Sequence, residues 1–332
     1  MRPFEHLGTI LRRELAAYFN SAIAYIFIIV FILFTGGLYM TQFFVIGRAD
    51  MRPFFLTLPF VLAVFLPAVT MRLWAEEKRG NTLELLLTFP MATHELVLGK
   101  FFAGLIFYLT ALGCTLPVPL MLGVLGDPDG GAVFGGYFGS FLIGAFFLAA
   151  GIFISGLCRD QIVAFILSLI VCFSLHLLGT EFFASSTDGW LPGFGSFLRF
   201  HLGSAARFDA FAKGVIDNRD ILYFLAGTSL FLVLNGFWLE GRMRPGARRI
   251  FTTASLVSAG IFLAANWLFA GIPLGRFDLT EGRIYTVSPA SKDILRRLKA
   301  PVIAKYYVSP LDKMPTGMKT LEQDVVDKLD EL

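Results

Sequence analysis

The chain has 332 residues, of which 56% are hydrophobic and 16% are charged, against about 45–50% and about 25% in an ordinary soluble protein. With 37 phenylalanines and a mean hydropathy of +0.69, this composition excludes a soluble globular fold, a disordered chain and a disulfide scaffold. The 28 Lys and Arg residues nearly balance the 25 Asp and Glu residues, so we expect no nucleic-acid partner. The composition therefore indicates an integral membrane protein.

The first segment, residues 1–21, has apolar side chains at helical spacing among charged ones. These apolar positions are Leu7, Ile10, Leu11, Leu15 and Phe19. The spacing predicts an amphipathic helix that lies on the cytoplasmic face of the membrane.

Seven apolar runs follow, each near the roughly 20 residues that a helix needs to cross a bilayer. The runs cover residues 22–46, 54–72, 101–125, 134–157, 161–180, 221–240 and 250–271. They are too long and too unbroken for the strands of a membrane barrel, which need about 10 residues of alternating character. The fold class that we expect is an all-α polytopic membrane protein.

The distribution of Lys and Arg predicts the orientation of the spans. With the N-terminus in the cytoplasm, the inside segments hold twelve basic residues and the outside loops between spans hold six. The C-terminal residues 272–332 then lie outside the cytoplasm. The residues between the fifth and sixth runs also lie outside, and Phe208, Phe211 and Val215 predict a helix there that grazes the membrane.

The sequence contains no pattern that indicates an enzyme. It has no phosphate-binding GxxxxGK[ST] loop, no HExxH and no GxSxG, so we expect no catalytic residue, no metal ligand and no cofactor in this chain. The apolar runs also contain few polar side chains, chiefly His176 and Asn266, and no buried Asp, Glu or Lys that would suit a proton-coupled carrier.

The stretch 73–100 is the longest and most charged inside segment. Thr82 is placed to cap a short helix that Pro90 ends, and its leucines give that helix an apolar face. The stretch is therefore either a solvated linker on the lipid headgroups or a surface that docks a soluble partner. The residues that we assign to this surface are Glu76, Glu77, Arg79, Gly80, Thr82, Leu83, Glu84, Leu86, Leu87 and Pro90.

Small residues recur every four positions in the fourth run. Those expected at a close helix contact are Gly135, Gly136, Gly139, Ser140 and Gly144. Such steps let helix backbones approach closely, either within one subunit or between the two subunits of a homodimer. Prolines at positions 59, 67, 117 and 119 should interrupt intrahelical hydrogen bonds in the second and third runs.

The segment after the sixth run reads as a separate module. Residues 241–249 form a basic linker, residues 250–271 a seventh membrane anchor, and residues 272–332 the start of a polar domain. In that domain Ser288 before Pro289 predicts a helix start, 301–308 a strand and 318–332 an amphipathic helix. One strand cannot close a sheet, so we expect this partial α/β module to be incomplete or to be completed by another chain.

Two stretches resemble the permeases of the ABC-2 exporter family. One is the pattern of Glu76, Gly80, Glu84 to Leu87 and Pro90, and the other is FDAFAKGVIDNRDILYF at 208–224. The resemblance covers about residues 8–240 and implies a six-span permease domain at 22–240. It is strongest to the gliding-motility and NosY-type branch of the family. RFDLTEGRIYTVSP at 276–289 resembles the start of the auxiliary subunit that accompanies the gliding-type permease.

This resemblance implies the transmembrane subunit of an ATP-driven exporter in a bacterial inner membrane. Two copies would form the path, and a separate ATPase, holding ATP and Mg²⁺, would dock on the 73–100 stretch. The C-terminal module would face an extracytoplasmic partner. Two rival interpretations remain, namely a mechanical or scaffolding membrane protein that moves its outside domain, and an enzyme whose site carries no recognisable motif.

Overall fold

The computed structural model describes residues 6–47, 49–89, 91–191, 193–242, 246–270, 275–283, 285–286 and 306–307, and it is mostly helical. The helices are α1 (Leu7–Phe19), α2 (Ala22–Ile46), α3 (Arg52–Thr70), α4 (Arg72–Arg79), α5 (Thr82–Thr88), α6 (Thr93–Gly113), α7 (Pro117–Leu125), α8 (Gly130–Leu157), α9 (Gln161–Leu177), α10 (Glu181–Asp188), α11 (Phe194–His201), α12 (Ser204–Ala212), α13 (Asn218–Arg242) and α14 (Ala247–Ala270). The strands are β1 (Val215–Asp217) and β2 (Arg276–Asp278).

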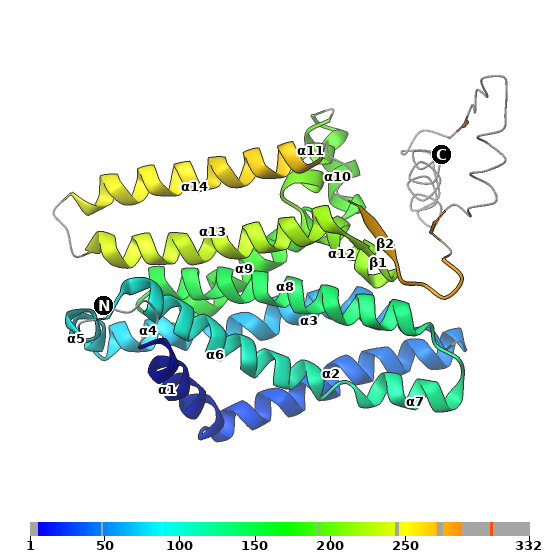
Figure 1. The fold of residues 1–332 in the computed structure, drawn as a ribbon, viewed down its shortest axis with the longest axis horizontal. Coiled ribbons are helices and arrows are strands. Elements are labelled where there is room, and N and C mark those ends of the chain that lie inside the picture. Colours follow the sequence, from blue (N-terminus) through cyan, green and yellow to red (C-terminus); the bar gives the residue numbers. More distant parts are fainter. Residues whose placement is uncertain are drawn as a thin grey trace.

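The long helices lie side by side as one bundle, with α8 at its centre (Figure 1). Helices α3, α6, α9 and α13 pack around α8, and 83% of the most apolar window of α8 is buried inside the protein. In the described part of the chain, six helical segments are long and apolar enough to cross a membrane. The predicted all-α polytopic membrane fold is confirmed.

Helices α2 and α14 lie at the edges of the bundle and leave apolar side chains uncovered. Only 28% of the apolar window of α2 and 11% of that of α14 are buried. Residues such as Leu33, Leu256 and Trp267 are more than two thirds exposed. In a membrane protein, lipid tails cover exposed apolar side chains of this kind.

The sequence predicts seven spans, and the described residues contain six; the number reaches seven only if the bent pair of α9 and α10 is counted as one span. The first run and α2 coincide, whereas the fifth run is not one straight helix. Helix α9 ends at Leu177, and α10 continues at an angle of 77°, because Thr180 caps α10 by accepting a hydrogen bond from the backbone N–H of Phe183. The third run divides at Pro117, which is the first residue of α7.

The end of the bundle with α10 to α12 also holds the two strands (Figure 1). The predicted helix through Val215 is corrected here: α12 ends at Ala212, and Val215 begins β1. Phe208 and Phe211 are buried in the core, so they do not lie on the membrane surface. Strand β1 pairs antiparallel with β2.

The C-terminal predictions lie almost wholly outside the described residues. These are the helix start at Ser288, the strand at 301–308 and the helix at 318–332. The described part of this module consists of β2, the turn that follows it and residues 306–307.

Candidate functional site

The candidate site is the end of the bundle where α1, α4, α5 and the start of α6 meet (Figure 1). Helix α4 continues α3 beyond a break at Met71, and α5 runs back from it after a tight turn. Asn81 makes this turn with φ of 53°, a left-handed conformation that Asn tolerates better than most residues. The predicted stretch 73–100 is therefore mostly helical and belongs to the bundle.

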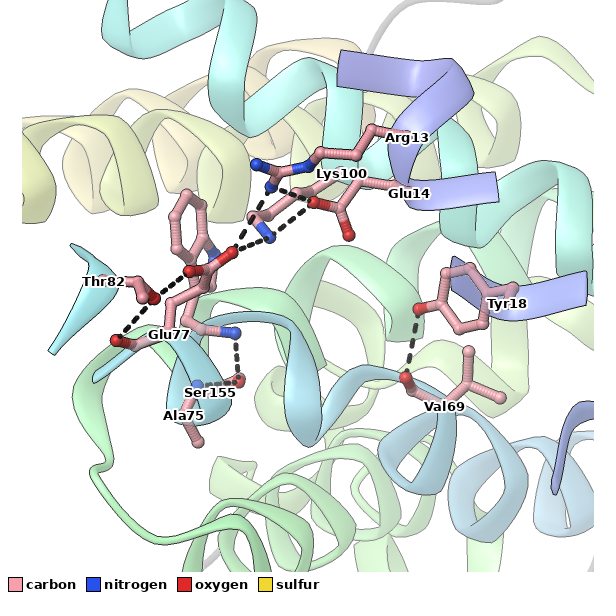
Figure 2. A network of polar contacts seen from close by, with 10 residues as sticks. Arg13, Glu14, Tyr18, Val69, Ala75, Glu77, Thr82, Lys100 and Ser155 are labelled. Carbon is pink, nitrogen blue, oxygen red and sulfur yellow. Dashed lines mark hydrogen bonds and ion pairs between the residues drawn. The ribbon is translucent and has the colours of Figure 1, made fainter. Parts of the chain in front are cut away.

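The break at Met71 is held by Ser155 of α8. The Ser155 hydroxyl accepts hydrogen bonds from the backbone N–H groups of Trp74 (3.2 Å) and Ala75 (3.3 Å), and donates to the carbonyl of Met71 (2.9 Å). A side chain that enters the helical ladder in this way produces a local break and satisfies the freed backbone groups. Figure 2 shows the Ser155 hydroxyl beside Ala75. The direction of α4 is thus set by α8.

Lys100 of α6 is the centre of a buried ion-pair network (Figure 2). Its side chain is 2% exposed, and its Nζ lies 2.9 Å from Glu14 Oε1 and 3.6 Å from Glu77 Oε1. Arg13 closes the network from the solvent side, 2.6 Å from Glu14 and 3.3 Å from Glu77. The Trp74 ring lies 5.0 Å from the Lys100 ammonium. The network joins α1, α4 and α6.

The charges in this network stabilise one another. Burial raises the pKa of Glu14, but the nearby Lys100 and Arg13 lower it more, so the net pKa lies below the usual value for a glutamate. A buried charge is tolerated when it is paired and hydrogen-bonded. Glu14 is therefore ionised at neutral pH and fixes α1 against Lys100.

Thr82 does not cap α5 as predicted. Asn81 holds the cap position without a side-chain bond, and the Thr82 hydroxyl instead turns back to the Glu77 carboxylate and to the Glu77 carbonyl, the latter at 3.2 Å. Glu77 thus contacts α5 and the Lys100 network at once. The structure brings Glu77 and Thr82 together and places Gly80 at the turn between their helices.

The predicted apolar docking face of α5 is corrected. Leu83 and Leu86 are 3% and 8% exposed and pack into the core of this chain, so they are not the exposed anchors of a docked partner. Leu87 is partly buried beside them. The exposed positions of α4 and α5 are Glu76, Arg79, Thr82, Glu84, Leu85 and Thr88, and Phe89 after them is also exposed. Pro90 lies outside the described residues.

A groove opens beside α5. It has a volume of about 410 Å³ and lies between α5, the start of α6 and the end of α13. Leu86, Leu87 and Met91 line its apolar side, and His94 and Glu240 lie at its polar side. This end of the protein thus offers an exposed helical hairpin, joined to the network of Lys100 through Glu77, and an adjoining groove.

Sequence reasoning missed the network. The sequence places Lys100 in a charged inside segment, where a basic residue is expected to face water, and nothing in its pattern predicts a buried pair with Glu14. The available signal was the four-residue spacing of Ile10, Glu14 and Tyr18, which puts Glu14 on the buried face of α1.

The small residues of α8 serve packing within one chain, and their predicted role at a dimer interface is not supported. A Cβ on Gly136 would overlap the ring of Phe55, and one on Gly139 would overlap Phe211. Gly144 lies against Tyr108 in the same way. The Tyr108 hydroxyl donates to the carbonyl of Ser140 at 2.7 Å. Gly135 faces the backbone of α12 and its following turn.

At the opposite end of the bundle, the segment after α14 is hydrogen-bonded to the bundle. The N–H of Leu279 donates to the carbonyl of Gly214, and the N–H of Glu281 donates to Asp129 Oδ2. Asp129 also caps α8, because its Oδ1 accepts from the N–H groups of Gly131 and Ala132. The polar segment after α14 therefore starts in contact with the first residues of α8.

Two family models match the sequence. Residues 47–237 match the model described as ABC-2 family transporter protein, and residues 281–332 match a domain of unknown function (DUF7088). No curated protein matches the chain. The first match covers more than half of the chain, from before α3 into α13, and includes the α4–α5 hairpin. This chain therefore belongs to the ABC-2 family of transporter membrane proteins.

Proposed function

We propose that the chain is the permease subunit of an ATP-driven exporter that docks a separate ATPase on α4 and α5. The ATPase binds ATP and Mg²⁺, and two copies of the permease form the path. Family membership supports the general role, since permeases of this family normally pair with an ATPase subunit.

The proposal of a docking surface rests on one observation: α4 and α5 form an exposed hairpin that the ion pairs of Lys100 hold in place. Leu85 is 62% exposed and Phe89 is 52% exposed, although both lie within a few residues of buried leucines. Glu76, Arg79 and Glu84 surround them with charge. An apolar centre with a charged rim, held by the network of Lys100, suits a surface that carries force to or from a partner.

Co-purification with a co-expressed P-loop ATPase of the ABC-transporter type tests the docking surface. Burying a large apolar side chain is worth about 1.5–3 kcal/mol, so Leu85→Asp with Phe89→Asp should weaken binding by about 100-fold or more. Leu191→Asp is the matched control, because Leu191 is 59% exposed in the turn after α10, at the opposite end. Wild-type yield of ATPase with the double variant would contradict this surface.

The orientation and the assembly belong to the same proposal. The inside segments hold twelve basic residues and the outside loops six, which supports a cytoplasmic N-terminus and an extracytoplasmic C-terminus in a bacterial inner-membrane protein. A homodimer would have to use faces other than the buried small residues of α8, and α2 and α9 both present exposed apolar side chains. A detergent-corrected mass of one protomer, with and without the ATPase, would rule out the dimer.

A mechanical function is the second candidate, and the strand pair favours it. The segment after α14 resembles the auxiliary subunit of the gliding-motility branch, and its first residues are hydrogen-bonded to β1 and to the start of α8. ATP hydrolysis would then move the extracytoplasmic module against an envelope partner. ATP-dependent transport of a labelled cargo into vesicles would favour the exporter, and a change in the position of the module without transport would favour the mechanical role.

A further inference from the structure

A second cavity lies at the end of the bundle opposite α4 and α5. It has a volume of about 350 Å³ and is bounded by α3, the bend between α9 and α10, α11, α12 and β2. Binding sites for small molecules occupy about 300–1,000 Å³, so this cavity has room for one ligand. It shares no residue with the groove beside α5.

One side of the cavity is apolar and aromatic. Leu56 and Phe60 of α3 face Phe208 and Ala206 of α12 across it. His176 forms part of this side: its ring meets the Phe60 ring edge-on at 4.6 Å, and its Nδ1 lies 3.4 Å from the Ser204 hydroxyl. Such a surface suits an apolar chain.

The wall of the cavity is rigid because two backbones touch there. Gly179, in the bend after α9, leaves no space for a side chain, since a Cβ at this position would overlap the backbone of Gly203 and Ala205. The two turns that precede α10 and α12 therefore pack against each other directly. A rigid wall favours binding because little ordering is lost when a ligand enters.

The lining of the cavity carries more positive than negative charge. Arg199, Lys213 and Arg276 line it, against Glu181 and Asp209. Asp209 also pairs with Lys213, whose Nζ lies at 2.9 Å, and with Arg52 at 3.5 Å. The excess of cations over anions favours an anionic group on this side of the cavity.

One of these cations comes from outside the region matched by the transporter family. Arg276 is the first residue of β2 and pairs in register with Asp217 of β1. The family match ends at residue 237, so the cavity is completed by the segment that follows the last membrane helix. The cavity therefore needs residues from both the matched region and the segment after α14.

We propose that this cavity binds an anionic amphiphile, a molecule whose apolar chain lies against the apolar side and whose carboxylate or phosphate lies beside the cations. Leu56, Phe60 and His176 on the apolar side belong to the spans α3 and α9, whereas the cations lie beyond these spans on α11, β2 and the turn after α12, which matches the two parts of such a molecule. The proposal goes beyond the proposed function, because it does not require the amphiphile to be cargo.

Photo-cross-linking of the purified full chain in phosphatidylcholine nanodiscs tests this site. One arm adds a long-chain fatty acid that carries a diazirine in its tail, and the other places a diazirine-bearing phosphatidylglycerol in the disc. Peptides that contain Phe60 or Phe208 should be labelled. Labelling by the fatty acid identifies a free amphiphile as the source, and labelling by the phospholipid identifies the bilayer.

Variants of the lining separate the two parts of the site. Ala206→Trp should fill the cavity and abolish labelling, whereas Leu120→Trp, at an exposed position of α7, should not change it. Arg199→Ala with Arg276→Ala should weaken labelling about tenfold, because charge-assisted hydrogen bonds are lost. Arg79→Ala, an exposed cation at the other end, is the matched control.

Three results would overturn the proposal. The first is equal labelling of wild type and Ala206→Trp, with both proteins monodisperse on size exclusion. The second is equal labelling by the methyl ester of the fatty acid, which would show that the negative charge does not matter. The third is the absence of label from both peptides in both arms. Because none of these measurements uses the ATPase, the proposed transport function can fail independently.

Discussion

Replacing Lys100 with Met should remove much of the stability of the end that holds α4 and α5. The ammonium of Lys100 lies 2.9 Å from Glu14 and 3.6 Å from Glu77, and its side chain is 2% exposed. Without it, the Glu14 carboxylate, 10% exposed, keeps only the half-exposed Arg13 as a counter-charge. Removing one partner of a buried pair costs about 3–5 kcal/mol. We expect a loss near the lower end of this range, because Arg13 remains.

The free energy of unfolding can be measured by titrating the purified permease with SDS in mixed micelles and following tryptophan fluorescence. Lys100→Met together with Glu14→Gln should recover most of the loss, since neither partner then carries a buried charge. Glu84→Gln is the control, because Glu84 is exposed on α5. A Lys100→Met protein within about 1 kcal/mol of wild type would refute the structural role of the network.

The pH dependence of the same network has a fixed sign. The pKa of Glu14 in the folded protein lies below its ordinary value of about 4.3, since Lys100 and Arg13 outweigh burial. Its contribution to stability is therefore complete above about pH 4.3 and is lost as the pH falls from there through the lower folded pKa. Glu14→Gln should lack this part of the acid sensitivity. Equal acid sensitivity of both proteins would contradict the assignment.

Three further predictions concern topology and packing. In a cysteine-free background, a membrane-impermeant maleimide should label Trp190→Cys in intact cells and should not label Arg79→Cys; the reverse result would invert the proposed orientation. Gly139→Ala should lower the unfolding free energy by about 1–3 kcal/mol through overpacking, whereas Gly113→Ala, with open space around it, should not; equal stability would mean that α8 is not closely packed there. Ser155→Ala should cost about 1–3 kcal/mol, because two buried backbone N–H groups lose their acceptor, and an unchanged unfolding free energy would mean that another group replaces the hydroxyl.

The sequence predicts the spans better than the contacts between them. Lipid requires about 20 apolar residues for each crossing, which is why the run 22–46 and α2 coincide. The bend after Leu177 could not be read in the same way, because Thr180 and Gly179 are compatible with a continuing helix until their contacts are known. Hydropathy measures the free energy of transferring a side chain from water to lipid, and it says little about where a helix bends.

The candidate site shows the same limit. The spacing of Leu83, Leu86 and Leu87 correctly predicts an apolar face, but a face of this kind packs equally well against its own chain or a partner. The pairing of Lys100 with Glu14 joins residues 86 positions apart, and the pattern of neither segment indicates the other. The part of the surface that remains exposed, including Leu85 and Phe89, could be identified only once the buried part was known.

Helix α8 connects the two ends of the molecule through fixed contacts. At one end Ser155 enters the backbone of α4, and the Gly156 and Cys158 carbonyls accept hydrogen bonds from Lys78 of α4. At the other end Asp129 caps α8 and holds the segment after β2 through Glu281. Because most of α8 is buried among its neighbours, it has little freedom to bend between these contacts. A displacement of α4 by a docked partner would therefore move α8 as a body, and with it the start of the C-terminal module.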